Sequence, residues 1–231
     1  MTPRPISPID QAFLTNHAGA GNLILVRHGQ QQWPDPSTSV TADWVNPPLS
    51  GIGEQQATTV GVHLSGESVD AVYSSHLLRA HHTGKAIAAH HDLDVVVRSD
   101  LEEIHLFRDL PQNKRAADTL GDEAVDNIRK RFAQTRSWDA YPHTEASTAF
   151  RGRVTKAIDE IARDHAGQNV VVACHGGVIN AYLANLLDIS PDMFFRPVHA
   201  SVHRVRFADA ARVVEVLNEQ HHLSAVGLVT T

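Results

Sequence analysis

Two short apolar runs, each ending in a histidine followed by glycine, constrain this chain more than any other feature of its sequence. Asn22–Arg27 leads into His28-Gly29, and Val170–Ala173 leads through Cys174 into His175-Gly176-Gly177. Continuous apolar runs this short, rich in β-branched residues, predict strands buried on both faces of a parallel sheet. Because ligand sites of such sheets lie at the carboxyl ends of the strands, both histidines are candidates for one site.

The rest of the chain alternates between strand patterns and helix patterns. Such alternation predicts a three-layer α/β/α sandwich around a mostly parallel central sheet. The further strands expected are Ala71–Ser74, Val95–Arg98, and a β-pair of Val202–Phe207 with Arg212–Leu217. The helices expected are 51–64 behind the N-cap Ser50, His76–His90, Leu120–Arg136, 145–167 behind the N-cap Thr144, and Val178–Leu187.

The chain has 231 residues, 42% of them hydrophobic, which is enough for one sizeable core. Residues 1–21 contain three prolines and no long apolar run. They are predicted to be an N-terminal extension with a short helix near Gln11–Leu14, and neither a signal peptide nor a membrane span. Residues 22–231 show no internal repeat and no linker, and they are expected to form a single domain.

The net charge of the chain limits which kinds of molecule it is expected to bind. Twenty basic residues against 26 acidic residues give a net charge of −6. Nucleic acids and anionic membranes are bound through clustered positive charge, so neither is an expected partner. The single cysteine, Cys174, cannot form an intramolecular disulfide, and a reducing compartment, the cytoplasm, is the expected location.

The chain is rich in histidine, with 16 residues of this type. None lies in a spacing typical of zinc motifs, so no metal site is expected. The pairs His81-His82, His90-His91 and His221-His222 are interpreted as solvated surface. The locally basic stretch His199–Arg206 is interpreted in the same way, as a solvated strand face.

The candidate site residues suit the transfer of a phosphoryl group. This group needs positive donors on its equatorial oxygens and a nucleophile in line with the leaving group. Arg27 and Arg79 can act as a bidentate clamp. An uncharged imidazole such as His28 can attack phosphorus and form a covalent intermediate. Glu102 or Glu103, just after the predicted strand Val95–Arg98, can supply the proton that the leaving group needs.

Five blocks of the sequence resemble the motifs of the histidine phosphatase superfamily, which also contains cofactor-dependent phosphoglycerate mutases. They occur in the family's order over roughly residues 23–205. The blocks are Leu25-Val26-Arg27-His28-Gly29, Pro48-Leu49-Ser50 with Gly53 and Gln56-Ala57, Tyr73-Ser74-Ser75-His76-Leu77-Leu78-Arg79-Ala80 with Thr83, Leu101-Glu102-Glu103-Ile104, and His175-Gly176-Gly177-Val178-Ile179. The resemblance implies a phosphoglycerate mutase-like fold.

The resemblance also implies roles for single residues. It makes His28 the nucleophile and Arg27 a phosphate ligand, and it adds Arg79 and His175 to the phosphate pocket. His199 lies where the family chain passes near this pocket. The family's acid stands directly before Ile104, which favours Glu103 over Glu102. Glycines after a strand leave backbone N–H groups facing a cleft, so Gly176 is a further candidate phosphate ligand.

The sequence departs from the family pattern just after the first block. Pro34 stands where an asparagine that contacts phosphate is common, and Gln31 is the candidate to replace that contact. After Ile104 the family often continues Gly and Trp-Glu-Gly, whereas this chain has His105–Leu110. This segment helps to shape the substrate pocket, so the substrate stays open.

The expected function is therefore that of a phosphatase acting on a small phosphorylated metabolite, without a cofactor. Two alternatives stay open. A mutase of the same family would move the phosphoryl group within or between sugar phosphates. A binding module would retain the fold without turnover. The sequence leaves the oligomeric state open, and a homodimer is one candidate.

Overall fold

The computed structural model describes residues 7–15, 17 and 19–231. Its strands are β1 (Gly21–Arg27), β2 (Ala71–Ser75), β3 (Val95–Arg98), β4 (Asn169–Cys174), β5 (Val202–Ala208) and β6 (Ala211–Glu219). They form a six-stranded sheet in the order β3-β2-β4-β1-β5-β6. The first four strands in this order are mutually parallel, whereas β5 runs antiparallel to both β1 and β6. The predicted α/β fold with a mostly parallel sheet is confirmed.

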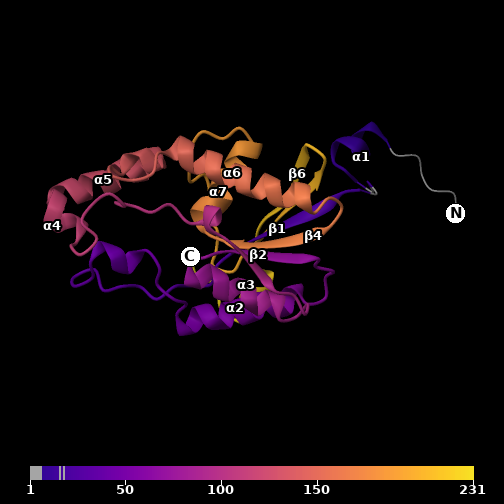
Figure 1. The fold of residues 1–231 in the computed structure, drawn as a ribbon, viewed down its shortest axis with the longest axis horizontal. Helices are drawn as coiled ribbons and strands as arrows, with labels where there is room; N and C mark the ends of the chain where they lie inside the picture. The colour runs from indigo at the N-terminus through magenta and orange to yellow at the C-terminus, as the bar shows by residue number, and fades with distance from the viewer. Residues whose placement is uncertain (1–6, 16, 18) are drawn as a thin grey trace.

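The helices are α1 (Pro8–Ala12), α2 (Gly51–Leu64), α3 (Leu78–Ala88), α4 (Ala116–Leu120), α5 (Asp122–Thr135), α6 (Ser147–Asp164), α7 (Gly176–Leu186) and α8 (His221–Ser224). Single turns of 3-10 helix occur at Thr41–Trp44, Ser99–Leu101 and Trp138–Ala140. Figure 1 shows α2 and α3 on one face of the sheet and α6 and α7 on the other, with α4 and α5 at the end far from α1. Among the described helices, none combines the length and the apolar character needed to cross a bilayer.

The side chains of β1 alternate between two cores. Leu23 and Leu25 belong to the cluster that includes the apolar faces of α6 and α7. Ile24 and Val26 belong to the cluster that includes residues of α2 and α3. Because successive strand residues point to opposite faces, a strand covered on both sides must be apolar at every position. This requirement explains the continuous apolar run that the sequence shows.

The two central strands β1 and β4 lie at a topological switch point. The chain leaves β1 through α2 toward β2, on the far side of β4, and it leaves β4 through α7 toward β5, on the far side of β1. Arg27, the last residue of β1, pairs in register with Cys174, the last residue of β4. Connections that diverge in this way open a crevice outside the strand ends, which is where such folds bind ligands.

Several helix predictions need correction. The short helix predicted near Gln11–Leu14 runs instead over Pro8–Ala12. The helix predicted over Leu120–Arg136 is interrupted at Gly121, whose φ of +88° favours glycine, so α4 ends and α5 begins there. Thr144 does not cap α6: the N-cap residue is Ala146, and the Thr144 hydroxyl instead accepts a hydrogen bond from the backbone of Phe107. The helix predicted from His76 begins at Leu78 and ends at Ala88.

Two helix glycines provide a matched test of packing. A Cβ atom at Gly61 of α2 would lie 2.5 Å from the carbonyl oxygen of Ala86 in α3, whereas a Cβ atom at Gly152 of α6 would meet no atom within 4 Å. We expect Gly61→Ala to lower the free energy of unfolding by about 1–3 kcal/mol through overpacking. We expect Gly152→Ala to raise it by about 0.5–1 kcal/mol through helix propensity. Urea denaturation of both variants measures the difference, and equal effects would contradict the close packing of α2 on α3.

Candidate active site

Four of the predicted site residues meet at the switch point. Arg27 ends β1 and His28 follows it, His175 follows β4, and Arg79 lies in the first turn of α3. The rings of His28 and His175 have their centroids 5.1 Å apart. The Nε atom of Arg79 lies 3.2 Å from Nε2 of His28. Residues separated by up to 148 positions in the chain therefore meet in one cluster.

The hydrogen bonds of His28 define its tautomer. Nδ1 lies 2.7 Å from the carbonyl oxygen of Gly29, which can only accept, so Nδ1 carries the proton. Arg79 Nε can only donate, so Nε2 of His28 accepts. Both contacts require the same neutral tautomer, which places the lone pair of Nε2 beside the Arg79 guanidinium. This is the form of imidazole that can act as a nucleophile.

The electrostatics of the pocket keep both histidines neutral. Burial, followed by the charges of Arg79 and nearby groups, holds the pKa values of His28 and His175 well below the ordinary range. Burial lowers the pKa of Arg27 and of Arg79 to about 10, with the Glu103 carboxylate opposing the shift in each case. Both arginines therefore remain charged at neutral pH, and the pocket is a region of positive potential.

Backbone carbonyl groups orient the two guanidinium groups. Arg79 Nη1 donates to the carbonyl oxygen of Val45 at 3.0 Å, and Arg27 Nη1 donates to that of Pro197. Arg27 Nη2 lies 2.9 Å from Nε2 of His199, whose Nδ1 in turn lies 2.9 Å from the hydroxyl of Thr230. His199 is thus a third histidine at the site, and its role here comes from holding Arg27.

The prediction of a solvated strand face over His199–Arg206 is wrong for both of its histidines. His199 and His203 are almost completely buried, and burial lowers the pKa of each to about 3. Only Arg204 and Arg206 point outward, and each forms an ion pair with a glutamate. His203 lies on the inward face of β5, whereas His199 lies in the turn before this strand, and a basic composition alone reveals neither position.

Several buried polar atoms of the pocket lack a partner. Within the described residues, Nε of Arg27 and both ring nitrogens of His175 form no hydrogen bond. Unpaired buried polar groups are costly, and they cluster where a ligand supplies the missing partner. Donors on two cationic side chains and on the imidazole of His175 form a receptor for a small anion such as a phosphoryl group.

The carboxyl group of Glu103 lies against the start of α7. Its Oε2 accepts a hydrogen bond from the backbone N–H of Gly177 at 2.9 Å, and its Oε1 accepts one from Ile104 at 3.0 Å. Burial raises the pKa of the Glu103 carboxyl group, although these two bonds and the nearby arginines oppose the shift. A carboxyl group with a raised pKa beside the pocket is suited to donate a proton.

Sequence reasoning missed the residue that holds the acid segment. Arg153 of α6 donates from Nη1 to the carbonyl oxygens of Asp100 and Glu102, at 2.9 and 3.0 Å. The same guanidinium pairs with Glu145 at 2.7 Å. Arg153 therefore fixes the backbone on which Glu103 stands. In the sequence, Arg153 is only one of several charged residues of this helix, and nothing there indicates its partners.

The remaining predicted residues line a cavity of about 900 Å³ in front of the cluster. Gln31, Glu102 and Gly176 line it, whereas Pro34 lines a neighbouring, smaller hollow. Aromatic side chains and charged side chains of both signs also line the cavity. They include Trp44, Phe107, Trp138, Tyr141, Arg115, Arg129, Arg196, Asp122 and Asp126.

Comparison with known proteins agrees with this geometry. Residues 23–220 match the family model described as histidine phosphatase superfamily (branch 1). The chain belongs to this superfamily. The match covers both strand ends, the acid segment and the last two strands, so the motif resemblance seen in the sequence is confirmed.

Named relatives fall into two activity classes. A 2,3-bisphosphoglycerate-dependent phosphoglycerate mutase from Rhizobium johnstonii is 32% identical over 73% of this chain and 80% of its own length. Phosphoserine phosphatase 1 from Hydrogenobacter thermophilus is 29% identical over 87% of this chain and 93% of its own length. The solved structure of a mycobacterial glucosyl-3-phosphoglycerate phosphatase shares the fold, with a TM-score of 0.70 and 22% identity over 87% of this chain and 99% of that chain.

Adjacent glycines at the start of α7 test the placement of Glu103. A Cβ atom at Gly177 would lie 2.2 Å from Oε1 of Glu103, whereas one at Gly176 would make only an ordinary 3.5 Å contact with Arg27. We expect Gly177→Ala to displace the carboxyl group and to lower kcat for an alkyl phosphate by about 10²-fold. Gly176→Ala is the control, with a smaller loss. Circular dichroism must show both variants folded, and equal kcat values would contradict the assigned contact.

Proposed function

We propose that this protein hydrolyses a small phosphate monoester in two steps, through a phosphohistidine on His28. The observation that carries the proposal is the fixed neutral tautomer of His28, with the lone pair of Nε2 among the cationic donors of the pocket. Hydrolysis through a nitrogen nucleophile requires no metal ion. The phosphatase names among the relatives support the same reaction class.

In the first step, Nε2 of His28 attacks the phosphorus atom and the bond to the ester oxygen breaks. Arg27, Arg79 and His175 donate to the equatorial oxygens of the transferring group, where the negative charge lies. Gln31 and the N–H of Gly176 are further proposed phosphate ligands. The ester oxygen leaves with the proton of Glu103.

In the second step, water attacks the phosphohistidine. The Glu103 carboxylate, left deprotonated by the first step, takes a proton from this water. The phosphorus–nitrogen bond breaks, inorganic phosphate leaves, and both Glu103 and His28 return to their starting forms. One carboxyl group thus serves as acid and then as base, so the site needs no second titrating residue near the leaving group.

The substrate that we propose is a phosphorylated metabolite small enough for a cavity of about 900 Å³. We place the reaction in the cytoplasm, because the single cysteine suits a reducing compartment. The net charge of −6 argues against nucleic acid as the substrate. A homodimer stays a prediction that sedimentation would test.

A mutase is the second candidate, because the Rhizobium relative that is 32% identical carries that name. A mutase must keep its phosphoenzyme from water long enough to return the phosphoryl group to an acceptor. Isomerisation of phosphoglycerate that depends on a bisphosphorylated primer would favour this reaction over hydrolysis. A binding module, in contrast, would turn over none of a panel of phosphate esters.

The nucleophile is tested by substitution and by trapping. We expect His28→Ala to lower the hydrolysis rate by about 10⁴-fold or more, because the covalent route is lost. Wild-type protein quenched during turnover should carry an acid-labile phosphoryl group that the variant lacks. Both assays should proceed unchanged with EDTA present. Equal rates for wild type and variant would refute His28 as the nucleophile.

Substitutions at the neighbouring residues Glu103 and Glu102 test which of them is the general acid. We expect Glu103→Gln to lower kcat for an alkyl phosphate by about 10²–10⁴-fold, and much less for p-nitrophenyl phosphate, whose leaving group needs no proton. Because the raised pKa keeps Glu103 protonated to a higher pH than usual, wild-type kcat should fall as pH rises through that value. Glu103→Gln should lose this decline. Glu102→Gln is the control, and an equal effect there would contradict the choice of Glu103.

A further inference from the structure

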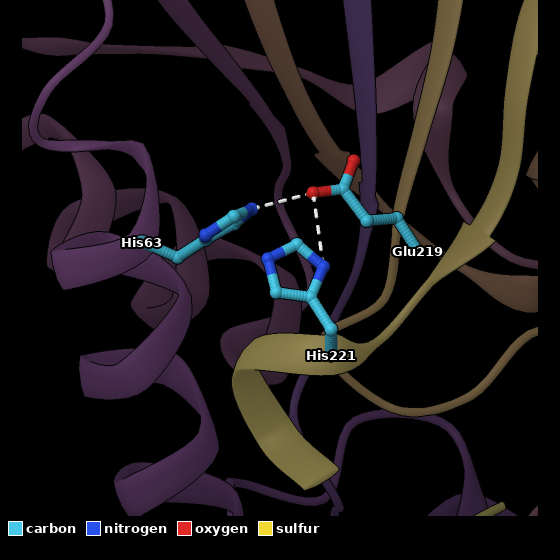
Figure 2. Close-up of side chains that lie close together, drawn as sticks. All are labelled: His63, Glu219 and His221. Atoms are coloured by element: carbon cyan, nitrogen blue, oxygen red, sulfur yellow. Dashed lines mark hydrogen bonds and ion pairs between the residues drawn. The ribbon is translucent and has the colours of Figure 1, made fainter. Parts of the chain in front are cut away.

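A cluster of metal-binding side chains lies outside the pocket, where α2, β6 and α8 meet. Figure 2 shows His63, Glu219 and His221 pointing toward one another from these three elements. Nε2 of His63 lies 2.7 Å, and Nδ1 of His221 3.7 Å, from the same oxygen of Glu219, Oε1. All three donor atoms lie within 4.8 Å of one another.

We propose that His63, Glu219 and His221 bind one divalent transition-metal ion. Two imidazole nitrogens and one carboxylate oxygen suit Zn²⁺, Co²⁺ or Ni²⁺, whereas Mg²⁺ and Ca²⁺ prefer oxygen ligands alone. In a tetrahedral zinc site with bonds of about 2.1 Å, ligand atoms lie about 3.4 Å apart. His63 and Glu219 would separate slightly, and His221 would move inward. Water would occupy the fourth position.

The surroundings of Glu219 prepare it to act as a ligand. Arg204 donates to the other carboxylate oxygen, Oε2, at 3.0 Å, which leaves Oε1 directed at the two histidines. Burial alone would raise the pKa of Glu219, but the bonds from Arg204 and His63 outweigh it, and the pKa is lowered. The charge of Arg204 is also balanced by Glu67 at 2.8 Å. The cluster with neutral histidines therefore carries one net negative charge, which favours a cation.

The neighbouring histidine supports the ring of His63. His222 stacks on it, with ring centroids 4.4 Å apart and an interplanar angle of 4°. His222, which the sequence predicted as solvated surface, is largely buried, and its Nε2 lies 3.1 Å from the carbonyl oxygen of Ala200. The His63 ring is thus held in orientation before a metal binds, and ligands held in this way bind metal more tightly. The largest adjustment falls on His221, whose side chain is 71% exposed.

The sequence pattern could not reveal this site. His63 and His221 are 158 positions apart, so no short motif joins them. The fold brings them together because β5 pairs Val202 with Glu219 at the end of β6, beside α2. An ion here would fasten α8 to α2 and to the sheet.

The test uses the full chain after treatment with a chelator, titrated with Zn²⁺ in a calorimeter and with Co²⁺ in a spectrophotometer. We expect one Zn²⁺ per chain at this site and the visible absorption of tetrahedral Co²⁺. His221→Ala should weaken binding at least about tenfold and remove the absorption, because even residues behind the ligands contribute this much. Because the side chain of His221 is exposed, we expect the variant to fold normally, and circular dichroism checks that it does.

Two controls separate this site from other histidines. His82→Ala removes an exposed histidine of α3 and should leave binding unchanged. His28→Ala removes the nucleophile of the pocket and should also leave this binding event unchanged. Binding lost in His28→Ala but retained in His221→Ala and His63→Ala would place the metal in the pocket and overturn the proposal. Absence of Zn²⁺ binding by the wild-type chain would overturn it as well.

Discussion

The burial of two cationic side chains without a carboxylate partner is the constraint on which the rest of the site depends. Within the described residues, neither Arg27 nor Arg79 forms an ion pair. Removing a guanidinium group from water is unfavourable unless other groups replace the lost hydrogen bonds. The carbonyl groups of Val45 and Pro197 replace only part of them. A bound phosphoryl group would accept the remaining hydrogen bonds of the two guanidinium groups. In the free pocket, these donors are therefore available to an anion.

The backbone just after His28 packs unusually close to the start of α2. A Cβ atom at Gly29 would lie 2.4 Å from the carbonyl oxygen of Gly53, near the start of α2. Gln56 of the same helix accepts a hydrogen bond from the backbone N–H of Gln30 at 2.7 Å. The loop after β1 is therefore packed against α2 and held by it. Such a rigid support would keep His28, the proposed nucleophile, in orientation while a phosphoryl group transfers.

Much of the fold and of the site follows from local sequence. The strands β1 and β4 could be predicted because a doubly covered strand must be apolar throughout, and each glycine turn marked where a strand ended. Glu103 could be chosen over Glu102 only through the family motif. The resemblance placed His199 near the pocket, but its contact with Arg27, 172 positions away, could not be predicted. The role of Arg153 could not be predicted either, because it acts through contacts at least 51 positions away. The helix was predicted to begin at Leu120, so the separate short helix α4 before Gly121 was missed.

The position of Cys174 at the end of β4 makes its thiol unreactive. The thiol is completely buried, and burial, together with the nearby Glu103 carboxylate, raises its pKa. Thiolates, not thiols, react with peroxides and alkylating agents. Phosphatases that use a cysteine nucleophile are switched off by such oxidants, whereas this chain offers them neither a thiolate nor access. The single cysteine of this chain is therefore protected from direct oxidation.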